Sequence, residues 1–329
     1  MERKLVCLGE ILIDFLPVAR GGEVAGFSLH PGGGPFNVAV GLARLGQPTA
    51  FVGKVGADYF GRRLRQAVRA EGIEDGWLLD APAPTPLAFV AHEDGEPVFT
   101  FYGDGAADTL LAPGDLPPAL FDSAAILHFG GISLLRGSTP AAALAAAEGL
   151  RGRALVSLDI NVRPRLIADA ATYRATLERA VAASDLLKLS AADVAWLAPG
   201  ADVAAYAAAQ LEAGPALVAL TRGGEGVSGL RLRGGRIERV DVPTFPVVVA
   251  DTVGAGDSFT AGLLAALAAA GVTGRAALEA MPAEQLGAAL RQGAAAAALN
   301  CSRPGADPPR AAELAAFLAA QPPLSDPQS

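Results

Sequence analysis

The stretch Asp251-Thr252-Val253-Gly254-Ala255-Gly256-Asp257-Ser258-Phe259 runs directly into an apolar run rich in alanine and leucine, residues 259–270. Small residues at 254–256 leave backbone N–H groups bare where a helix is predicted to begin, and a helix N-terminus attracts anions. Such a turn suits a phosphoryl group in transfer. Taken alone, Asp257 in the first turn is more often a helix cap than a functional carboxylate. Two aspartates around a small-residue turn favour the functional interpretation.

On both sides of this stretch, apolar runs typical of buried strands alternate with helical patterns. Such alternation forms βαβ units, which build a doubly wound, mostly parallel sheet with helices on both faces. We therefore predict an α/β fold. The predicted strands are residues 4–9, 49–52, 125–129, 154–159, 186–189 and 216–221, and the predicted helices are residues 36–45, 61–71, 140–149, 171–183, 203–213 and those from 258 onward.

Two segments break the alternation, because both carry short strands with no helix between them. They are residues 11–31 and 86–104. Asp94-Gly95, flanked by alternating apolar residues, is a strong hairpin signal. We predict that the two segments form a small β-sheet lid inserted in the α/β core.

Composition and charge exclude several classes of protein. The 329 residues are 51% hydrophobic and 18% charged, which suits a large core. The net charge of −8 and the lack of a basic stripe argue against a nucleic-acid partner. The most apolar run, residues 261–272, is too short to span a bilayer, and the N-terminus lacks a signal-peptide pattern. Cys7 and Cys301 make no disulfide framework, and three scattered histidines make no zinc site. We expect a soluble, cytoplasmic protein.

One nucleotide-binding pattern fails its structural context. Gly224-x-Gly226-x-x-Gly229 matches the dinucleotide fingerprint, which requires a helix directly after it. Here a hairpin is predicted instead, with Gly234-Gly235 joining residues 231–233 to residues 236–240. A dinucleotide site of the Rossmann type is therefore excluded.

Two signatures identify a family. The pattern D-T-x-G-A-G-D-x-F at residues 251–259 resembles the C-terminal signature of the PfkB, or ribokinase-like, carbohydrate kinases. Gly-Gly-Gly-Pro-Phe-Asn-Val-Ala at residues 32–39 resembles their N-terminal signature, G-G-x-x-x-N-x-A. The order and separation fit, and the resemblance covers nearly the whole chain. It implies that residues 1–329 form one ribokinase-like α/β kinase domain with an inserted lid, which uses ATP to phosphorylate a sugar hydroxyl.

Finer features are similar to the fructokinase branch of that family, so the resemblance implies a fructokinase-like enzyme. A 2-keto-3-deoxygluconate kinase, a ribokinase, and a non-catalytic sugar or nucleotide sensor remain alternatives. The stretches that carry the finer resemblance are residues 9–15, 129–134, 159–164, 188–190 and 302–306.

The resemblance also implies roles for individual residues. Asp257 is the general base that takes the proton from the acceptor hydroxyl, and the amides of Gly254, Ala255 and Gly256 stabilise charge on the γ-phosphoryl group. Carboxylate and amide groups supply the hydrogen-bond partners that a polyol needs. The implied acceptor residues are Asp14, Gly32, Gly33, Asn37, Phe101, Arg163 and Asp257, and the implied ATP-binding residues are Lys188, Thr221, Gly223, Gly226, Gly254 and Gly256.

Cofactors and assembly follow from the same resemblance. It implies Mg²⁺ together with ATP, and a monovalent cation, K⁺, near Asp251, Val253 and Gly305. A lid with hairpin edges is a liability unless it is covered, and lids of this family often pair between subunits. We therefore expect a homodimer formed through the lid.

Three positions depart from the family's patterns. Where many fructokinases carry K-x-S-E, this chain has Ala191 after Ser190, and the nearest carboxylate is Asp193. The pattern F-x-F-Y-R ends here in Gly103, and an asparagine common before the C-terminal alanine run is replaced by Gly293.

The departure at Gly103 bears on the choice of sugar. It removes an arginine that could pair with a sugar acid, and the carboxylate of Asp14 would repel one. Arg163 could supply the missing positive charge. We expect a neutral ketohexose such as fructose to be preferred.

Overall fold

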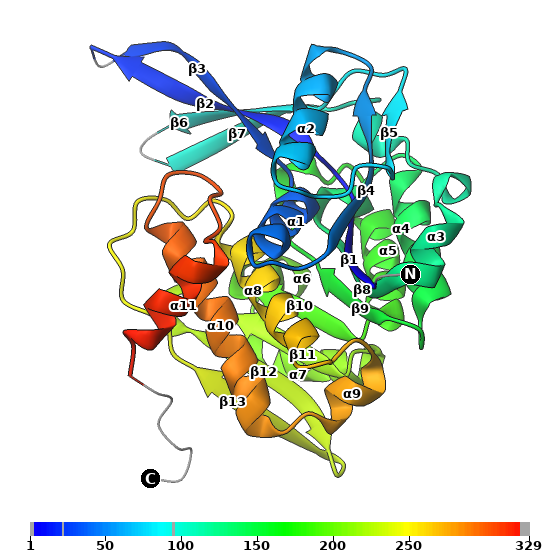
Figure 1. Ribbon diagram of the computed structural model, residues 1–329, viewed down its shortest axis with the longest axis vertical. Coiled ribbons are helices and arrows are strands. Elements are labelled where there is room, and N and C mark those ends of the chain that lie inside the picture. The colour runs from blue at the N-terminus through cyan, green and yellow to red at the C-terminus, as the bar shows by residue number, and fades with distance from the viewer. Residues whose placement is uncertain (1–2, 22, 94–95, 323–329) are drawn as a thin grey trace.

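A computed structural model describes residues 3–21, 23–93 and 96–322 of the chain. It contains the predicted mostly parallel sheet with helices on both faces, and a second, smaller sheet (Figure 1). The large sheet consists of β1 (Lys4–Leu8), β4 (Thr49–Gly56), β5 (Leu78–Ala81), β8 (Ala124–Gly130), β9 (Leu155–Asp159), β10 (Leu186–Ser190), β11 (Leu217–Thr221), β12 (Val227–Arg233) and β13 (Arg236–Val242). The helices are α1 (Gly34–Arg44), α2 (Tyr59–Ala70), α3 (Pro118–Ser123), α4 (Thr139–Leu150), α5 (Ala170–Ala183), α6 (Ala191–Leu197), α7 (Val203–Ala213), α8 (Ala255–Ala269), α9 (Arg275–Ala280), α10 (Ala283–Cys301) and α11 (Ala311–Ala319).

The strand order of the large sheet reverses between β1 and β8. The order is β13-β12-β11-β10-β9-β8-β1-β4-β5, and only the β11–β12 and β12–β13 pairs are antiparallel. From β1 the chain proceeds through β4 to β5 on one side, and β8 then returns to the other side of β1. In open α/β sheets, ligands bind outside the carboxyl ends of the strands at such a reversal. The topology therefore predicts a ligand site at the residues that follow β1 and β8.

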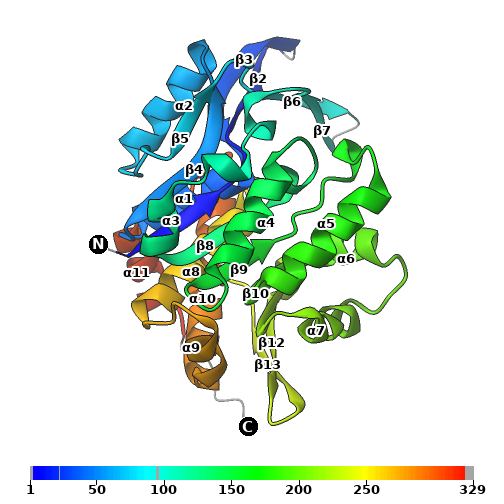
Figure 2. The same cartoon turned by 90° about the vertical axis from the view of Figure 1, so that its right-hand side faces the viewer.

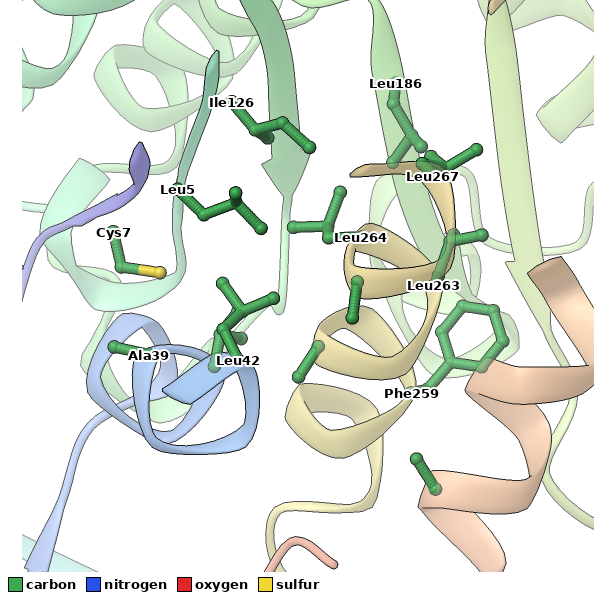
Figure 3. Close-up of a cluster of buried hydrophobic side chains, with 14 of the residues drawn as sticks. Leu5, Cys7, Ala39, Leu42, Ile126, Leu186, Phe259, Leu263, Leu264 and Leu267 are labelled. Atoms are coloured by element: carbon green, nitrogen blue, oxygen red, sulfur yellow. The ribbon is translucent and has the colours of Figure 1, made fainter. Parts of the chain in front are cut away.

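Strand alternation divides the core between the two faces of the sheet. Leu5 and Cys7 of β1 point toward α1 and α8 (Figure 3). Val6 and Leu8 belong to a second buried cluster, which includes residues of α4, α5 and α7; Figure 2 shows these three helices on one side of the sheet. Successive side chains of a strand face opposite sides, so each central strand supports both helical layers. Packing of α1 against α8 on one face brings the N-termini of both helices to the same end of the sheet.

The second sheet confirms the predicted lid. It consists of β3 (Glu23–Gly32), β2 (Leu12–Arg20), β6 (Leu87–Glu93) and β7 (Glu96–Tyr102), in that order. The β2–β3 and β6–β7 pairs are antiparallel and β2–β6 is parallel. Asp94-Gly95, the predicted turn, lies outside the described residues. Figure 1 shows this sheet at the top of the molecule, apart from the large sheet.

The hairpin predicted at residues 231–240 is also confirmed. It is formed by β12 and β13, which pair from Val227↔Val242 to Arg233↔Arg236. No helix in the described part of the chain has both the length and the hydropathy that crossing a membrane requires.

Candidate active site

A cavity of about 550 Å³ lies at the carboxyl ends of β1, β8 and β9. The lid contributes Asp14, Ala88 and Phe101 to its wall, and the core contributes the first turns of α1 and α8. The two sequence signatures therefore meet in one hollow, although they lie at opposite ends of the chain.

Asp257 occupies the first turn of α8 and is 8% exposed. Its Oδ2 accepts a hydrogen bond of 2.8 Å from Nδ2 of Asn37, in the first turns of α1. Burial raises the pKa of Asp257, while the Asn37 hydrogen bond and the charges of Lys188 and Arg163 oppose the rise. Asp257 does not cap its helix, since α8 begins without a side-chain cap. A buried carboxylate that faces a cavity is suited to accept a proton.

The turn before α8 presents backbone amides to the cavity. Gly254 has a left-handed φ of 73°, and a Cβ there would lie 2.5 Å from Cβ of Ala306, so only glycine fits. The amide of Ala255 donates to the carbonyl of Thr252 at 3.2 Å. Among the described residues, the amide of Gly256 has no hydrogen-bond partner. The free amides of this turn, rather than that of Ala255, are therefore available to an anion.

Buried Asn300 and half-buried Asp251 hold the turn in place. Asn300 donates through Nδ2 to the carbonyl of Val253 at 2.7 Å and accepts from Oγ of Ser258 at 3.1 Å. Asp251 accepts from the amides of Val253, at 3.0 Å, and Gly305, at 2.9 Å. Asp251, Val253 and Gly305, the residues expected near a monovalent cation, thus lie together.

The acceptor side of the cavity contains two carboxyl groups with raised pKa values. Burial, helped by the charge of Asp257, raises the pKa of Asp14 to about 7. Burial also raises the pKa of Glu10 to about 7, against hydrogen bonds from Ser133 and Gly34. The Glu10 carboxylate accepts from the Gly34 amide at 3.0 Å and from the Ser133 amide at 3.2 Å, so it ties the start of α1 to the turn after β8.

Lys188 lies beneath the α8 turn, buried with Asp159. Its Nζ is 3.0 Å from Oδ2 and 3.1 Å from Oδ1 of Asp159, and a Cβ on Gly256 would lie 3.1 Å from that Nζ. Burial lowers the pKa of Lys188, but the nearby carboxylates of Asp159, Asp193 and Asp257 outweigh this effect and raise it. Lys188 therefore stays cationic directly below the turn that faces the cavity.

Asp193, the nearest carboxylate after Ala191, binds backbone amides of the protein itself. Its Oδ2 accepts from the amide of Ser190 at 2.7 Å, and its Oδ1 accepts from the amide of Val162 at 2.8 Å. It completes the capping box of α6, whose N-cap is Ser190, and fixes the segment after β9. The described residues contain no group of three or more His, Cys, Asp or Glu side chains able to hold a metal ion.

The structure brings most of the expected acceptor residues together and places several nucleotide residues elsewhere. Gly32 lies behind the Asp14 carboxylate, and Thr221 ends β11 at the same edge of the sheet. The predicted residues that line the cavity are Asp14, Gly33, Asn37, Phe101, Arg163, Gly254, Gly256 and Asp257; those that do not are Gly32, Lys188, Thr221, Gly223, Gly226 and Ala255.

Several residues of the site were not predicted, and four of them bear on its chemistry or its shape. Glu10, Asn161 and Arg165 line the cavity, and Asn300 supports the turn. Glu10 carries a signal in the sequence, since it is a charged residue within an apolar stretch. Asn161 is the one described non-glycine residue with a positive φ, of 44°, which asparagine tolerates better than most residues.

Comparison with known proteins agrees with this geometry. Residues 2–312 match the family described as pfkB family carbohydrate kinase. A fructokinase of Rhizobium leguminosarum bv. trifolii is 38% identical over 80% of this chain and 79% of its own.

Solved structures give the same result. The crystal structure of a fructokinase from Xylella fastidiosa with bound ATP has a TM-score of 0.87 and 32% identity, covering 97% of this chain and 99% of that one. The structure of a Vibrio cholerae O395 fructokinase with fructose, ADP and calcium has a TM-score of 0.82 and 28% identity, covering 96% and 99%. The chain is a fructokinase-like sugar kinase and belongs to the PfkB family of carbohydrate kinases.

Proposed function

We propose that this kinase transfers the γ-phosphoryl group of ATP to a hydroxyl of a neutral ketohexose, with fructose as its preferred acceptor. The contact between Asn37 and Asp257 carries the proposal, because it places a buried carboxylate where the sugar cavity meets the N-terminus of α8.

In the proposed reaction, Asp257 takes the proton of the acceptor hydroxyl as that oxygen attacks the γ-phosphorus. The new oxygen–phosphorus bond forms while the bond to the bridging oxygen of ADP breaks, and ADP leaves with the negative charge. The amides of Gly254 and Gly256 stabilise the charge on the phosphoryl oxygens, and buried Lys188 adds a positive charge below them. The small side chain of Ala255 leaves the neighbouring backbone N–H groups accessible to the phosphoryl group.

The acceptor lies between the lid and the core in this proposal. Asp14, Asn37 and the backbone at Gly33 bind its hydroxyl groups, and the ring of Phe101 covers one face of the sugar. Of these groups, Asp14 accepts or donates according to its protonation state, since its pKa is close to neutrality.

The nucleotide extends along the sheet edge, over Thr221 and the loop with Gly223 and Gly226. The ATP phosphates would hold Mg²⁺, because the nearby carboxylates of Asp159 and Asp193 are already hydrogen-bonded or ion-paired. When bound, it neutralises phosphate charge.

A K⁺ ion fits the donor set at Asp251, Val253 and Gly305, which consists of a carboxylate and backbone carbonyl oxygens. Each Asp251 oxygen accepts one amide hydrogen bond and keeps a further lone pair. There the ion would hold the turn before α8 in place.

A sugar-acid kinase is the second candidate, favoured by two arginines at the cavity. Arg163 and Arg165 both line it, and Arg165 makes no side-chain hydrogen bond or ion pair with any described residue. Gly103 and the carboxylate of Asp14 favour the neutral sugar.

The test compares kcat/KM for fructose, 2-keto-3-deoxygluconate and ribose on one preparation with ATP and Mg²⁺. We expect fructose to exceed the acid by about tenfold or more, since a buried unpaired carboxylate costs several kcal/mol. A tenfold preference for the acid would make Arg163 or Arg165 its ligand. Turnover of ribose alone would refute the ketohexose, and ATP and sugar binding without turnover would indicate a sensor.

The proposal includes one kinase domain, residues 1–329, with lid segments 11–31 and 86–104, and a homodimer formed through the lid. It places the protein in the cytoplasm, in keeping with the free thiols of Cys7 and Cys301.

A further inference from the structure

An arginine of the core lies against the lid aromatic residue that lines the acceptor cavity. The guanidinium carbon of Arg136 is 4.7 Å from the ring centroid of Phe101, and Nη1 of Arg136 is 3.0 Å from Oδ1 of Asp104. Arg136 follows the turn after β8, where Ile132 lines the cavity, whereas Phe101 and Asp104 belong to the end of β7 and the residues after it. Arg136 therefore joins core and lid beside the cavity.

The space that Arg136 occupies exists because position 103 is glycine. A Cβ at Gly103 would lie 2.3 Å from Nη2 of Arg136 and 2.0 Å from Cε1 of Phe101. Real Cβ atoms do not approach neighbours so closely, so any larger residue would displace both the guanidinium and the ring. An arginine at 103, as in the F-x-F-Y-R pattern, and Arg136 in its present position exclude each other.

The partners of Arg136 leave part of its guanidinium free. Nη2 is buried and has no hydrogen-bond partner among the described residues, and its charge opposes the burial that raises the pKa of Asp108 to about 6. The Asp104 carboxylate is fully exposed, so that ion pair contributes little on its own. Stacking on Phe101 is consequently the contact through which Arg136 can influence the site.

We propose that Arg136 is a positioning residue for the acceptor: it holds the Phe101 ring in the cavity wall. In this role Arg136, a residue of the core, takes the place of the arginine that the F-x-F-Y-R pattern has at position 103. This inference rests on the proposed function. Arg136 is absent from the cavity lining, so it acts through Phe101 and does not itself bind the sugar. Loss of the stacked cation would loosen the ring and weaken sugar binding, and it would leave the ATP side of the site unchanged.

The experiment measures KM and kcat for fructose and for ATP in a double-mutant cycle. Arg136→Ala is expected to raise KM for the sugar about 2- to 30-fold, the range of a cation–π contact, with KM for ATP within about twofold. The KM of Arg136→Lys for the sugar should lie between that of the wild type and that of Arg136→Ala. Gly103→Arg should also raise KM for the sugar, and Gly103→Arg with Arg136→Ala should recover part of the loss seen in each single variant. Arg179→Ala, an exposed ion-paired arginine on α5, is the matched control.

Three results would overturn the inference. The first is an unchanged KM for the sugar in Arg136→Ala. The second is an equal rise of KM for the sugar and for ATP in that variant, together with a lowered Tm. The third is a double variant whose KM for the sugar rises by the product of the two single-variant increases. If Arg136→Ala does not fold, Arg136→Lys and Gly103→Arg decide the matter. Failure of the wild-type enzyme to phosphorylate any sugar would instead refute the proposed function, and this inference with it.

Discussion

Asn37 donates a hydrogen bond of 2.8 Å to Asp257 across 220 residues of sequence. It joins the start of α1 to the first turn of α8, and these two helices pack side by side on one face of the large sheet (Figure 1). In the proposed reaction Asn37 binds the acceptor and Asp257 is the general base, so this contact would set the distance between the sugar and the transferred group.

Replacement of Asp257 by Asn should remove most turnover while leaving ATP affinity nearly unchanged. The variant keeps the size of the side chain but loses the proton acceptor, and the amides of the α8 turn remain. Loss of a general base costs about 100- to 10,000-fold in kcat. Steady-state kinetics and calorimetric titration with ATP measure the two effects. A kcat within about twofold of wild type would exclude Asp257 from proton transfer.

Replacement of Asn37 by Leu should move the acidic limb of the pH–rate profile to higher pH. The proposed mechanism needs ionised Asp257, and the Asn37 hydrogen bond stabilises that form and lowers its pKa. Without the bond the pKa rises, so activity at low pH falls more than activity at high pH. The pH dependence of kcat/KM from about pH 5 to 9 tests this sign. An unshifted limb would mean that the hydrogen bond does not tune the base.

Replacement of Asp14 by Asn should weaken sugar binding yet stabilise the fold above neutral pH. In the folded state the pKa of Asp14 is raised from 3.8 to about 7, so the native state holds its proton more tightly than the unfolded state. Wild-type stability contributed by this group therefore falls as pH rises from about 4 to 7, and an amide avoids that loss. We expect Tm to rise by roughly 2 to 6 °C at pH 8 and little at pH 4. A lower Tm at pH 8 would contradict this reasoning.

The sequence predicted those parts of the fold that depend on local pattern. β11 ends at Thr221 as predicted, because its apolar run stops there before glycines, and it begins within one residue of the predicted start. α7, capped by Asp202, begins and ends as predicted. α8 begins at Ala255, three residues before the predicted position, because glycines conceal a helix start. The short strand β5 and the helix α6 were missed, since four and seven residues carry little periodicity.

The site was predictable only where a motif fixes it. Asp257, Asn37 and Asp14 could be named from signatures, but their convergence depends on the packing of α1 against α8. The stacking of Arg136 on Phe101 joins residues on different elements, and no local pattern encodes such a contact. The role of Asp193 in the capping box of α6 likewise becomes evident only when its partners Ser190 and Val162 are placed.

The exposed apolar side chains of the lid predict a homodimer. Val24 is 60% exposed, Phe27 42% and Tyr102 62%, and they belong to the two edge strands, β3 and β7, of a four-stranded sheet. Open edges with apolar residues invite pairing with a second copy, which would bury them. Light scattering at micromolar concentration should give twice the monomer mass, and Val24→Asp should yield a folded monomer with a weaker affinity for sugar. Ile237→Asp, equally apolar and 52% exposed on β13, should remain a dimer. A wild-type monomer, or dissociation by both variants, would refute assembly through the lid.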